Sequence, residues 1–240
     1  MLWTTRLNRL TGIVLLLTAI ATVLVIVFGM NSDADPFKKT EIDDFLRDID
    51  DNRKAMVFGL AVDVVIHSGL GLALAGLLYL LFRGRDRLLA LFGFGFLLAA
   101  FIASIASGAI NAALILVAHD FVKGGPGGMA AGDPAILEVG RALAVSSILV
   151  DQSSLTAFGL AVLSFGALIT WAPLGAGANP PRWLGWFAML GGLAFVLSWL
   201  IAITDAAFVL FIVGGLASLI WMVVLGVWLL RTPDAAPQTA

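Results

Sequence analysis

Apolar residues form long blocks along this chain, separated by short stretches of charged or proline-rich sequence. A helix needs about 20 apolar residues to cross the hydrocarbon layer of a bilayer, so we interpret the blocks as membrane-crossing helices. They predict six crossings, near residues 10–30, 55–82, 88–118, 135–171, 183–203 and 207–230. The last apolar stretch, Trp183 to Leu230, is too long for one crossing, and we expect it to turn back at Thr204 and Asp205.

The segment between the first two crossings follows a different pattern. Over residues 37–52 it carries both signs of charge, while Ile42, Phe45, Leu46 and Ile49 recur at helical spacing. This pattern predicts a short amphipathic helix that lies at the membrane surface. At the other end of the chain, we expect residues 232–240 to form a short disordered tail.

The composition supports an all-α integral membrane protein with one domain over residues 1–240. We expect a six-transmembrane-helix bundle with the interfacial amphipathic helix between helices 1 and 2. Of the 240 residues, 60% are hydrophobic and only 12% are charged, which is about half the charged share of a soluble domain. The net charge of -2, without a basic stripe, argues against nucleic-acid binding. The absence of cysteine excludes disulfides and cysteine nucleophiles.

Proline, glycine and arginine refine this picture. All eight prolines fall outside the predicted crossings, so we expect unbroken helices. The glycine pairs Gly191-Gly192 and Gly214-Gly215 indicate close helix packing. Half of the fourteen basic residues lie in short segments at one set of helix ends, which predicts that both termini are cytoplasmic. These residues are Arg6, Arg9, Arg83, Arg85, Arg87, Arg182 and Arg231.

Within the hydrocarbon parts of the predicted crossings, the only carboxylates are Asp63 and Asp151 and the only ionisable base is His67. A charge in the hydrocarbon costs about 2.5–3.5 kcal/mol on insertion scales, so such residues usually face protein or a wet cavity. Asp63 and His67 are four residues apart and share a helix face with small residues, including Gly59 and Gly71. We expect this face to pack against other helices.

Two further crossings carry polar columns that could meet this face. The third has Ser104, Ser107, Gly108 and Asn111, and the fourth has Ser147, Asp151 and Ser154 with Gln152 beside them. Convergence of the three columns would form a polar pocket in the outer half of the bundle, for a small or lipid-like ligand or for protons. The candidate binding residues are Asp63, His67, Asn111, Asp151 and Gln152.

Other interpretations of these residues stay open. Asp63 and His67 can hydrogen-bond each other and a neighbouring helix in a purely structural role. A zinc site usually has three protein ligands, and His119 lies too far along its helix to share a haem with His67, so we expect no metal and no cofactor. No catalytic residue is predicted, because the serines near Asp151 show no triad or metal signature.

Two stretches of sequence carry a family resemblance. They are FLRDIDDNRKAMVFGLAVDVVIHSGLGLALAGLLYLLFR, from Phe45 to Arg83, and NPPRWLGWFAMLGG, from Asn179 to Gly192. Together they resemble a bacterial integral membrane family called domain of unknown function 4386. The resemblance implies a polytopic protein of the bacterial cytoplasmic (inner) membrane, and it transfers no activity and no site residue.

Three classes of function follow from the sequence. The first is a non-enzymatic membrane protein that binds a small or lipid-like ligand, or protons, in the polar pocket. The second is an accessory or scaffold subunit of a membrane complex, and the third is an intramembrane enzyme. The expected partners are membrane lipids, together with a small-molecule ligand, partner subunits or further copies of the chain.

Overall fold

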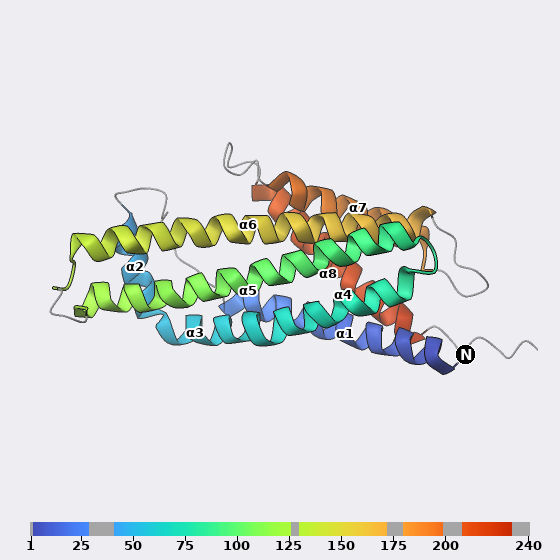
Figure 1. Ribbon diagram of the computed structural model, residues 1–240, viewed down its shortest axis with the longest axis horizontal. Helices are drawn as coiled ribbons and strands as arrows, with labels where there is room; N and C mark the ends of the chain where they lie inside the picture. Colours follow the sequence, from blue (N-terminus) through green and yellow to red (C-terminus); the bar gives the residue numbers. More distant parts are fainter. Residues whose placement is uncertain (1, 29–40, 126–129, 172–179, 199–207, 232–240) are drawn as a thin grey trace, which may run out of the picture. The chain divides into compact units, whose positions relative to one another are not determined.

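The computed structural model describes residues 2–28, 41–125, 130–171, 180–198 and 208–231, and nearly all of them are helical. The elements follow one another along the chain as Figure 1 shows. They are α1 (Leu2–Phe28), α2 (Ile42–Asp51), α3 (Arg53–Ala61), the π-helix η1 (Val62–His67), α4 (Ser68–Phe82), α5 (Arg87–Lys123), α6 (Pro134–Trp171), α7 (Arg182–Leu197) and α8 (Phe208–Arg231).

The prediction of an all-helical fold with membrane-like helices is confirmed. Five helical stretches in the described chain are long and apolar enough to cross a membrane. They are Arg6–Phe28, Arg53–Phe82, Arg87–Lys123, Pro134–Trp171 and Val209–Arg231. The helix α7 is apolar but has only 16 residues. The predicted turn at residues 204 and 205 and the predicted tail 232–240 lie outside the described residues.

The chain forms two compact units, and α1, α4, α5 and α6 contribute residues to both. Unit 1 consists of Met1–Ile20, Gly69–Phe101 and Ser154–Ala240, and unit 2 consists of Ala21–Ser68 and Ile102–Ser153.

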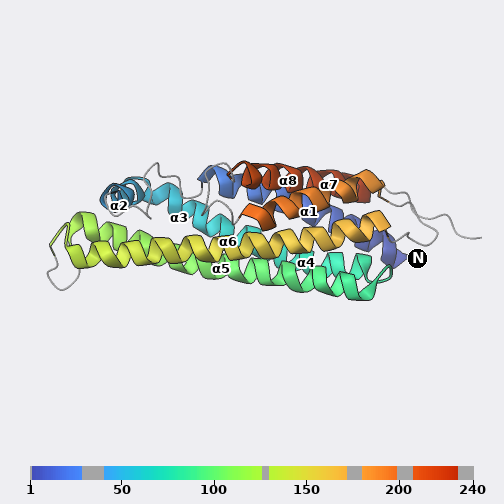
Figure 2. The same ribbon diagram turned by 90° about the horizontal axis from the view of Figure 1, so that it is seen from above.

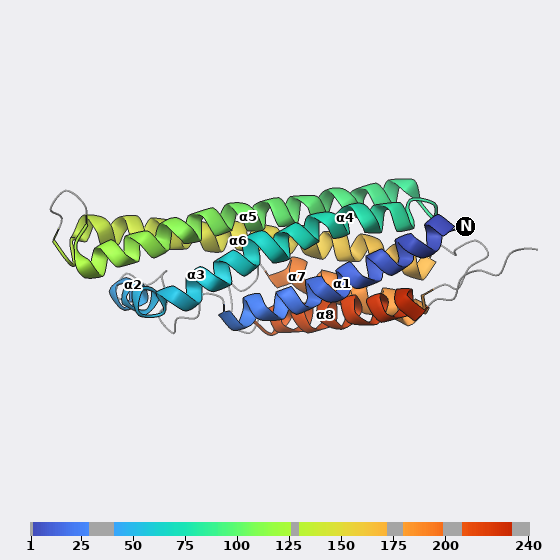
Figure 3. The same cartoon turned by 90° about the horizontal axis from the view of Figure 1, so that it is seen from below.

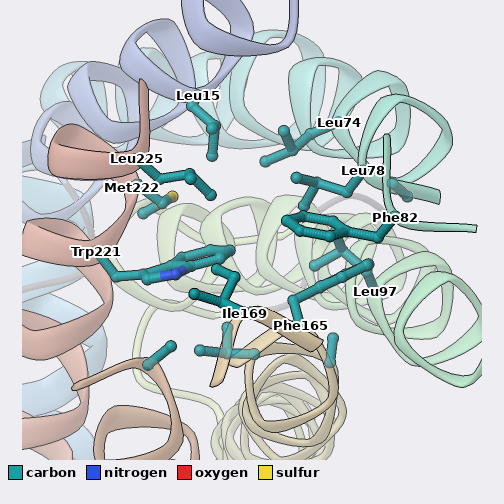
Figure 4. Packing of buried hydrophobic residues seen from close by; sticks show 14 of the residues in the cluster. Leu15, Leu74, Leu78, Phe82, Leu97, Phe165, Ile169, Trp221, Met222 and Leu225 are labelled. Carbon is teal, nitrogen blue, oxygen red and sulfur yellow. The ribbon is translucent and has the colours of Figure 1, made fainter. Parts of the chain in front are cut away.

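Unit 1 has an apolar core to which every one of its helices contributes. Its largest fully buried side chains include Phe82, Phe165 and Trp221, from α4, α6 and α8. Figure 4 shows these rings with leucines from α1, α4 and α5 around them. Such packing between helices is what holds a bundle together in a membrane, because lipid is as apolar as the side chains themselves.

Glycines allow close approach of the helices in unit 1. A Cβ atom on Gly12 would lie 2.8 Å from the carbonyl oxygen of Gly226, so α1 and α8 meet backbone to backbone, and Figure 2 shows them side by side. A Cβ on Gly192 would lie 2.5 Å from the carbonyl oxygen of Gly159 in α6. Gly191 faces Ala217 in the same close manner. The predicted packing role is therefore confirmed for Gly191-Gly192.

Arg85, in the turn between α4 and α5, connects that turn to the end of α6. Its guanidinium lies 5.0 Å from the centre of the Phe82 ring, and its Nη1 donates a 2.9 Å hydrogen bond to the carbonyl oxygen of Leu168. A cation there complements the negative end of the α6 dipole. Burial lowers the pKa of Arg85 to about 10, so the side chain stays charged at neutral pH.

Unit 2 is built around the amphipathic helix α2. The four residues predicted to form its apolar face, Ile42, Phe45, Leu46 and Ile49, are all buried. They pack with residues of α5 and α6, including Leu114, Ile115, Phe121, Ile136 and Ala144. This apolar face is therefore covered by protein rather than left for lipid, while the position of α2 at a membrane surface stays a prediction.

The ends of α5 and α6 in unit 2 carry clear local signals. Gly124 follows the last residue of α5 with φ 90°, a left-handed conformation that commonly ends a helix. Asp133 precedes α6, and its carboxylate accepts a 2.8 Å hydrogen bond from the amide of Ala135. Pro134 is the first residue of α6, where its missing N–H costs nothing.

Candidate functional site

The second crossing is one continuous run of helix, as expected, but it changes from α to π geometry at its most polar point. Residues Val62–His67 form a π-helix between α3 and α4, and the amide of Ser68 donates to the carbonyl of Asp63, five residues earlier. Figure 3 shows α3 and α4 as one run of helix with this segment between their labels. Short π segments are rare and occur frequently at functional sites.

Asp63 is the centre of one group of hydrogen bonds in unit 2. Its Oδ1 lies 2.9 Å from Nδ1 of His67. The hydroxyl of Ser104 in α5 donates to both carboxylate oxygens at 3.4 Å, and the hydroxyl of Ser68 donates to Ser104 at 3.4 Å. Ser68 is fully buried, while the side chains of Asp63 and His67 are 23% and 18% exposed. A carboxylate, an imidazole and two hydroxyls therefore share one polar site.

A second group of hydrogen bonds joins α5 to α6. The hydroxyl of Ser147 donates to Oδ1 of Asn111 at 2.5 Å, and Nδ2 of Asn111 donates to the hydroxyl of Ser107 at 3.5 Å. The hydroxyls of Ser107 and Ser147 are 3.3 Å apart, which closes a ring of three side chains. Both serines are buried, at 1% and 4% exposure.

Asp151 in α6 has neighbours in both groups of hydrogen bonds. Its carboxyl lies near the hydroxyls of Ser107 and Ser147 and near the carboxyl of Asp63. Gln152 is half-buried and follows Asp151, and consecutive residues of a helix do not share a face, so it projects in a different direction.

We refer to the two groups together as the polar cluster. It consists of Asp63, His67, Ser68, Ser104, Ser107, Asn111, Ser147 and Asp151, all in unit 2. Four of the five predicted site residues, Asp63, His67, Asn111 and Asp151, thus lie within it. Whether the cluster binds anything stays a prediction.

The small residues predicted to share a face with Asp63 and His67 do pack against helices. In unit 2, Gly59 lies against the backbone of Phe28, where a Cβ would overlap the Phe28 carbonyl. In unit 1, Gly71 lies against the ring of Phe101, and Ala75 is fully buried. This face is the packed side of the crossing, as the sequence predicted.

A second aspartate–histidine pair lies elsewhere in unit 2. Nδ1 of His119, near the end of α5, is 2.9 Å from Oδ1 of Asp50 in α2. The Asp50 side chain is only 10% exposed, and that of His119 is 37% exposed. The helix α2 thus supplies a carboxylate to His119 near the end of α5.

The geometry also bears on metal binding and catalysis. Within the ranges that the structure describes, no three histidine or acidic side chains are placed to hold a metal ion. In a hydrolytic triad the histidine stands between the acid and the nucleophile. Here Asp63 stands between Ser104 and His67.

Sequence reasoning missed the part that Ser68 plays in the cluster. On a regular α-helix, Ser68 would point well away from Asp63, because five residues advance about 140° beyond a full turn. The signal that could have found it was Ser104, which belongs to a predicted polar column and bonds both side chains.

Comparison with protein families decides where the chain belongs. The family described as "Domain of unknown function (DUF4386)" matches residues 10–232. The chain belongs to the DUF4386 family. This match covers nearly the whole chain and confirms the resemblance seen in the sequence, so all the helices above from α2 to α8 are part of the family domain. No curated protein and no solved structure matches the chain.

Proposed function

We propose that this DUF4386 protein crosses the bacterial inner membrane six times, with both termini in the cytoplasm, and that its polar cluster binds protons or a small, lipid-like ligand. The observation that carries the proposal is the cluster itself. Two carboxylates and an imidazole lie among buried hydroxyls on helices that are otherwise apolar. Side chains of this kind are costly in a membrane and usually mark a pathway or a binding site.

The sixth crossing rests on α7. This helix is apolar and ends at Leu197, and the following residues 199–207 lie outside the described chain. Its 16 residues extend about 24 Å, which is within a few residues of a full hydrocarbon crossing. Together with the five longer helical stretches, a crossing by α7 would make an even number, which supports the proposal that both termini lie on the same side.

Helix lengths support a position of the cluster near the outer boundary of the hydrocarbon. Counting along each helix, about 20 residues separate cluster members from the basic or tryptophan residue at the predicted cytoplasmic end, or roughly 30 Å of helix. The pairs are Asp63 and Arg83, Ser107 and Arg87, and Asp151 and Trp171. Because the hydrocarbon layer is also about 30 Å thick, protons or a ligand headgroup could reach the cluster from the outer surface.

The pattern of charges favours a cationic occupant. The cluster holds two carboxyl groups and one imidazole, while its other members supply hydroxyl and amide oxygens. A bound proton, or a cationic headgroup of a lipid-like molecule, would offset the repulsion between two ionised carboxylates. Membrane lipids are therefore the proposed surroundings and one proposed source of the ligand.

The experiment is a pH titration of the thermal midpoint of the purified protein in detergent. It compares wild type with Asp63→Asn and Asp151→Asn between about pH 4 and pH 8. Arg85 does not titrate in this window, because its pKa is about 10. If both substitutions abolish the same titration step, the two carboxylates form one coupled site.

The matched control is Asp44→Asn on the exposed side of α2, which should leave that step unchanged. Two silent cluster substitutions would contradict the proposal. The polar groups would then serve helix packing alone, and the protein would be better described as an accessory or scaffold subunit.

A further inference from the structure

The π-helix η1 coincides with the ionisable pair of the cluster. It begins at Val62 and ends at His67, so Asp63 and His67 lie inside it and Ser68 follows directly. A π-helix has i→i+5 hydrogen bonds and turns by roughly 80° per residue, less than the 100° of an α-helix. The rotation between residues in this segment therefore differs from that in the rest of the crossing.

This difference brings a third side chain to the face of Asp63. With roughly 80° per residue, positions four and five after Asp63 lie about 40° to either side of it. On an α-helix the fifth position would lie about 140° away. The π geometry therefore allows His67 and Ser68 to face Ser104 together with Asp63, which is the arrangement observed.

A glycine of α5, Gly108, packs directly against η1. A Cβ atom on Gly108 would overlap Cγ2 of Val64, and it would lie 3.4 Å from Cδ1 of Leu60. Gly108 is buried and lies four residues after Ser104, so both are on the same side of α5. The absence of a side chain at this position lets η1 approach closely enough for Ser104 to reach Asp63.

We propose that η1 and its contact with Gly108 position the polar cluster. Val64 and Gly108 are positioning residues, and Ser68 and Ser104 are further members of the binding site. The inference rests on the proposed function of the cluster and adds to it the element that sets its geometry. It also accounts for a π-helix at this point, since a regular α-helix would turn Ser68 away from α5.

The first test measures how closely η1 approaches α5, and it does not depend on ligand binding. The chain has no cysteine, so the double variant Ser68→Cys with Ser104→Cys contains only the introduced thiols. The two hydroxyl oxygens are 3.4 Å apart, so thiols at these positions should come close enough to be oxidised to a disulfide. Oxidation should cross-link this variant, while a control with Ser68→Cys and the exposed Ser153→Cys should stay reduced.

Gly108→Ala in this background places a methyl group where Val64 now lies. The cross-linking yield should fall by about fivefold or more, which corresponds to an overpacking cost of about 1 kcal/mol. Adding Val64→Ala removes the overlapping methyl and should restore the yield. If Gly108→Ala prevents folding, Val64→Ile adds a methyl group at the same contact from the other side and should lower the yield in the same way.

The second test repeats the pH titration with these variants and the serines intact. Gly108→Ala should abolish the titration step that depends on Asp63 and Asp151, although it removes no ionisable group, and adding Val64→Ala should restore the step. Unchanged cross-linking in Gly108→Ala would overturn the inference, as would a lost cross-link with an intact titration step. If wild type shows no such step, the proposed function fails. The cross-linking yields still decide whether the contact with Gly108 sets the position of η1.

Discussion

Leu46→Ala tests whether α2 is part of the folded protein or a helix held by the membrane surface. The Leu46 side chain is fully buried, and a Cβ on Gly140 in α6 would lie only 2.8 Å from its Cδ1. Replacing a leucine packed so closely leaves a cavity, and the cost in cores of this kind is about 2.7–5.0 kcal/mol. An undocked α2 could bury part of its apolar face in the detergent, so we expect a loss near the lower end.

The assay is hydrogen exchange of the α2 amides in the purified protein. A loss of about 3 kcal/mol corresponds to exchange roughly 150-fold faster, if α2 exchanges by undocking from α5 and α6. The control is Leu116→Ala in α5, because Leu116 is 58% exposed. This substitution should change the exchange rates of the α2 amides by less than about threefold. Equal small effects of the two substitutions would refute the packing of α2 against protein.

Three further predictions concern single contacts, and thermal unfolding in detergent measures each of them. Ser218→Ala should leave the free energy of unfolding unchanged or raise it by up to about 1 kcal/mol, because the buried hydroxyl has no hydrogen-bond partner among the described residues. A decrease of more than about 1 kcal/mol would contradict this prediction. Arg85→Met should lower the free energy of unfolding by about 1–2 kcal/mol, because the charged hydrogen bond to the Leu168 carbonyl is lost. An unchanged free energy of unfolding would show that this hydrogen bond does not stabilise the fold. His119→Ala should lower the free energy of unfolding by about 2 kcal/mol, because it leaves the nearly buried Asp50 carboxylate without its histidine partner. The double variant with Asp50→Asn should lose less free energy of unfolding than His119→Ala alone.

Much of the fold could be predicted because lipid imposes a simple rule on the sequence. The apolar blocks gave the helices, and the spacing of Ile42, Phe45, Leu46 and Ile49 gave α2 with its buried face. The third apolar block was ended at residue 118, but α5 continues to Lys123. The reason is that α2 covers this polar end of the helix, and a packing partner cannot be inferred from local hydropathy.

The candidate site was predictable where helical spacing alone decides which side chains share a face. The columns containing Asp63, Ser107, Asn111 and Asp151 follow from that spacing, and the structure brings them together. The contact of η1 with Gly108 could not be predicted, since it depends on a close approach between two helices.

The long-range partners were equally out of reach of the sequence. Asp50 and His119 are 69 residues apart, and Arg85 and Leu168 are 83 residues apart. No periodicity links such positions, because only the tertiary fold brings them together. The two histidines of the chain nevertheless share one feature in the structure, which is a carboxylate at 2.9 Å from Nδ1.

The central claim is that Asp63 and Asp151 belong to one site, and a double-mutant cycle tests it most directly. The free energy of unfolding at neutral pH is measured for wild type, Asp63→Asn, Asp151→Asn and the double variant. If the carboxylates interact, the change in the double variant should differ from the sum of the single changes by more than about 0.5 kcal/mol. Additivity within about 0.3 kcal/mol would show that the two carboxylates are independent and would contradict a shared site.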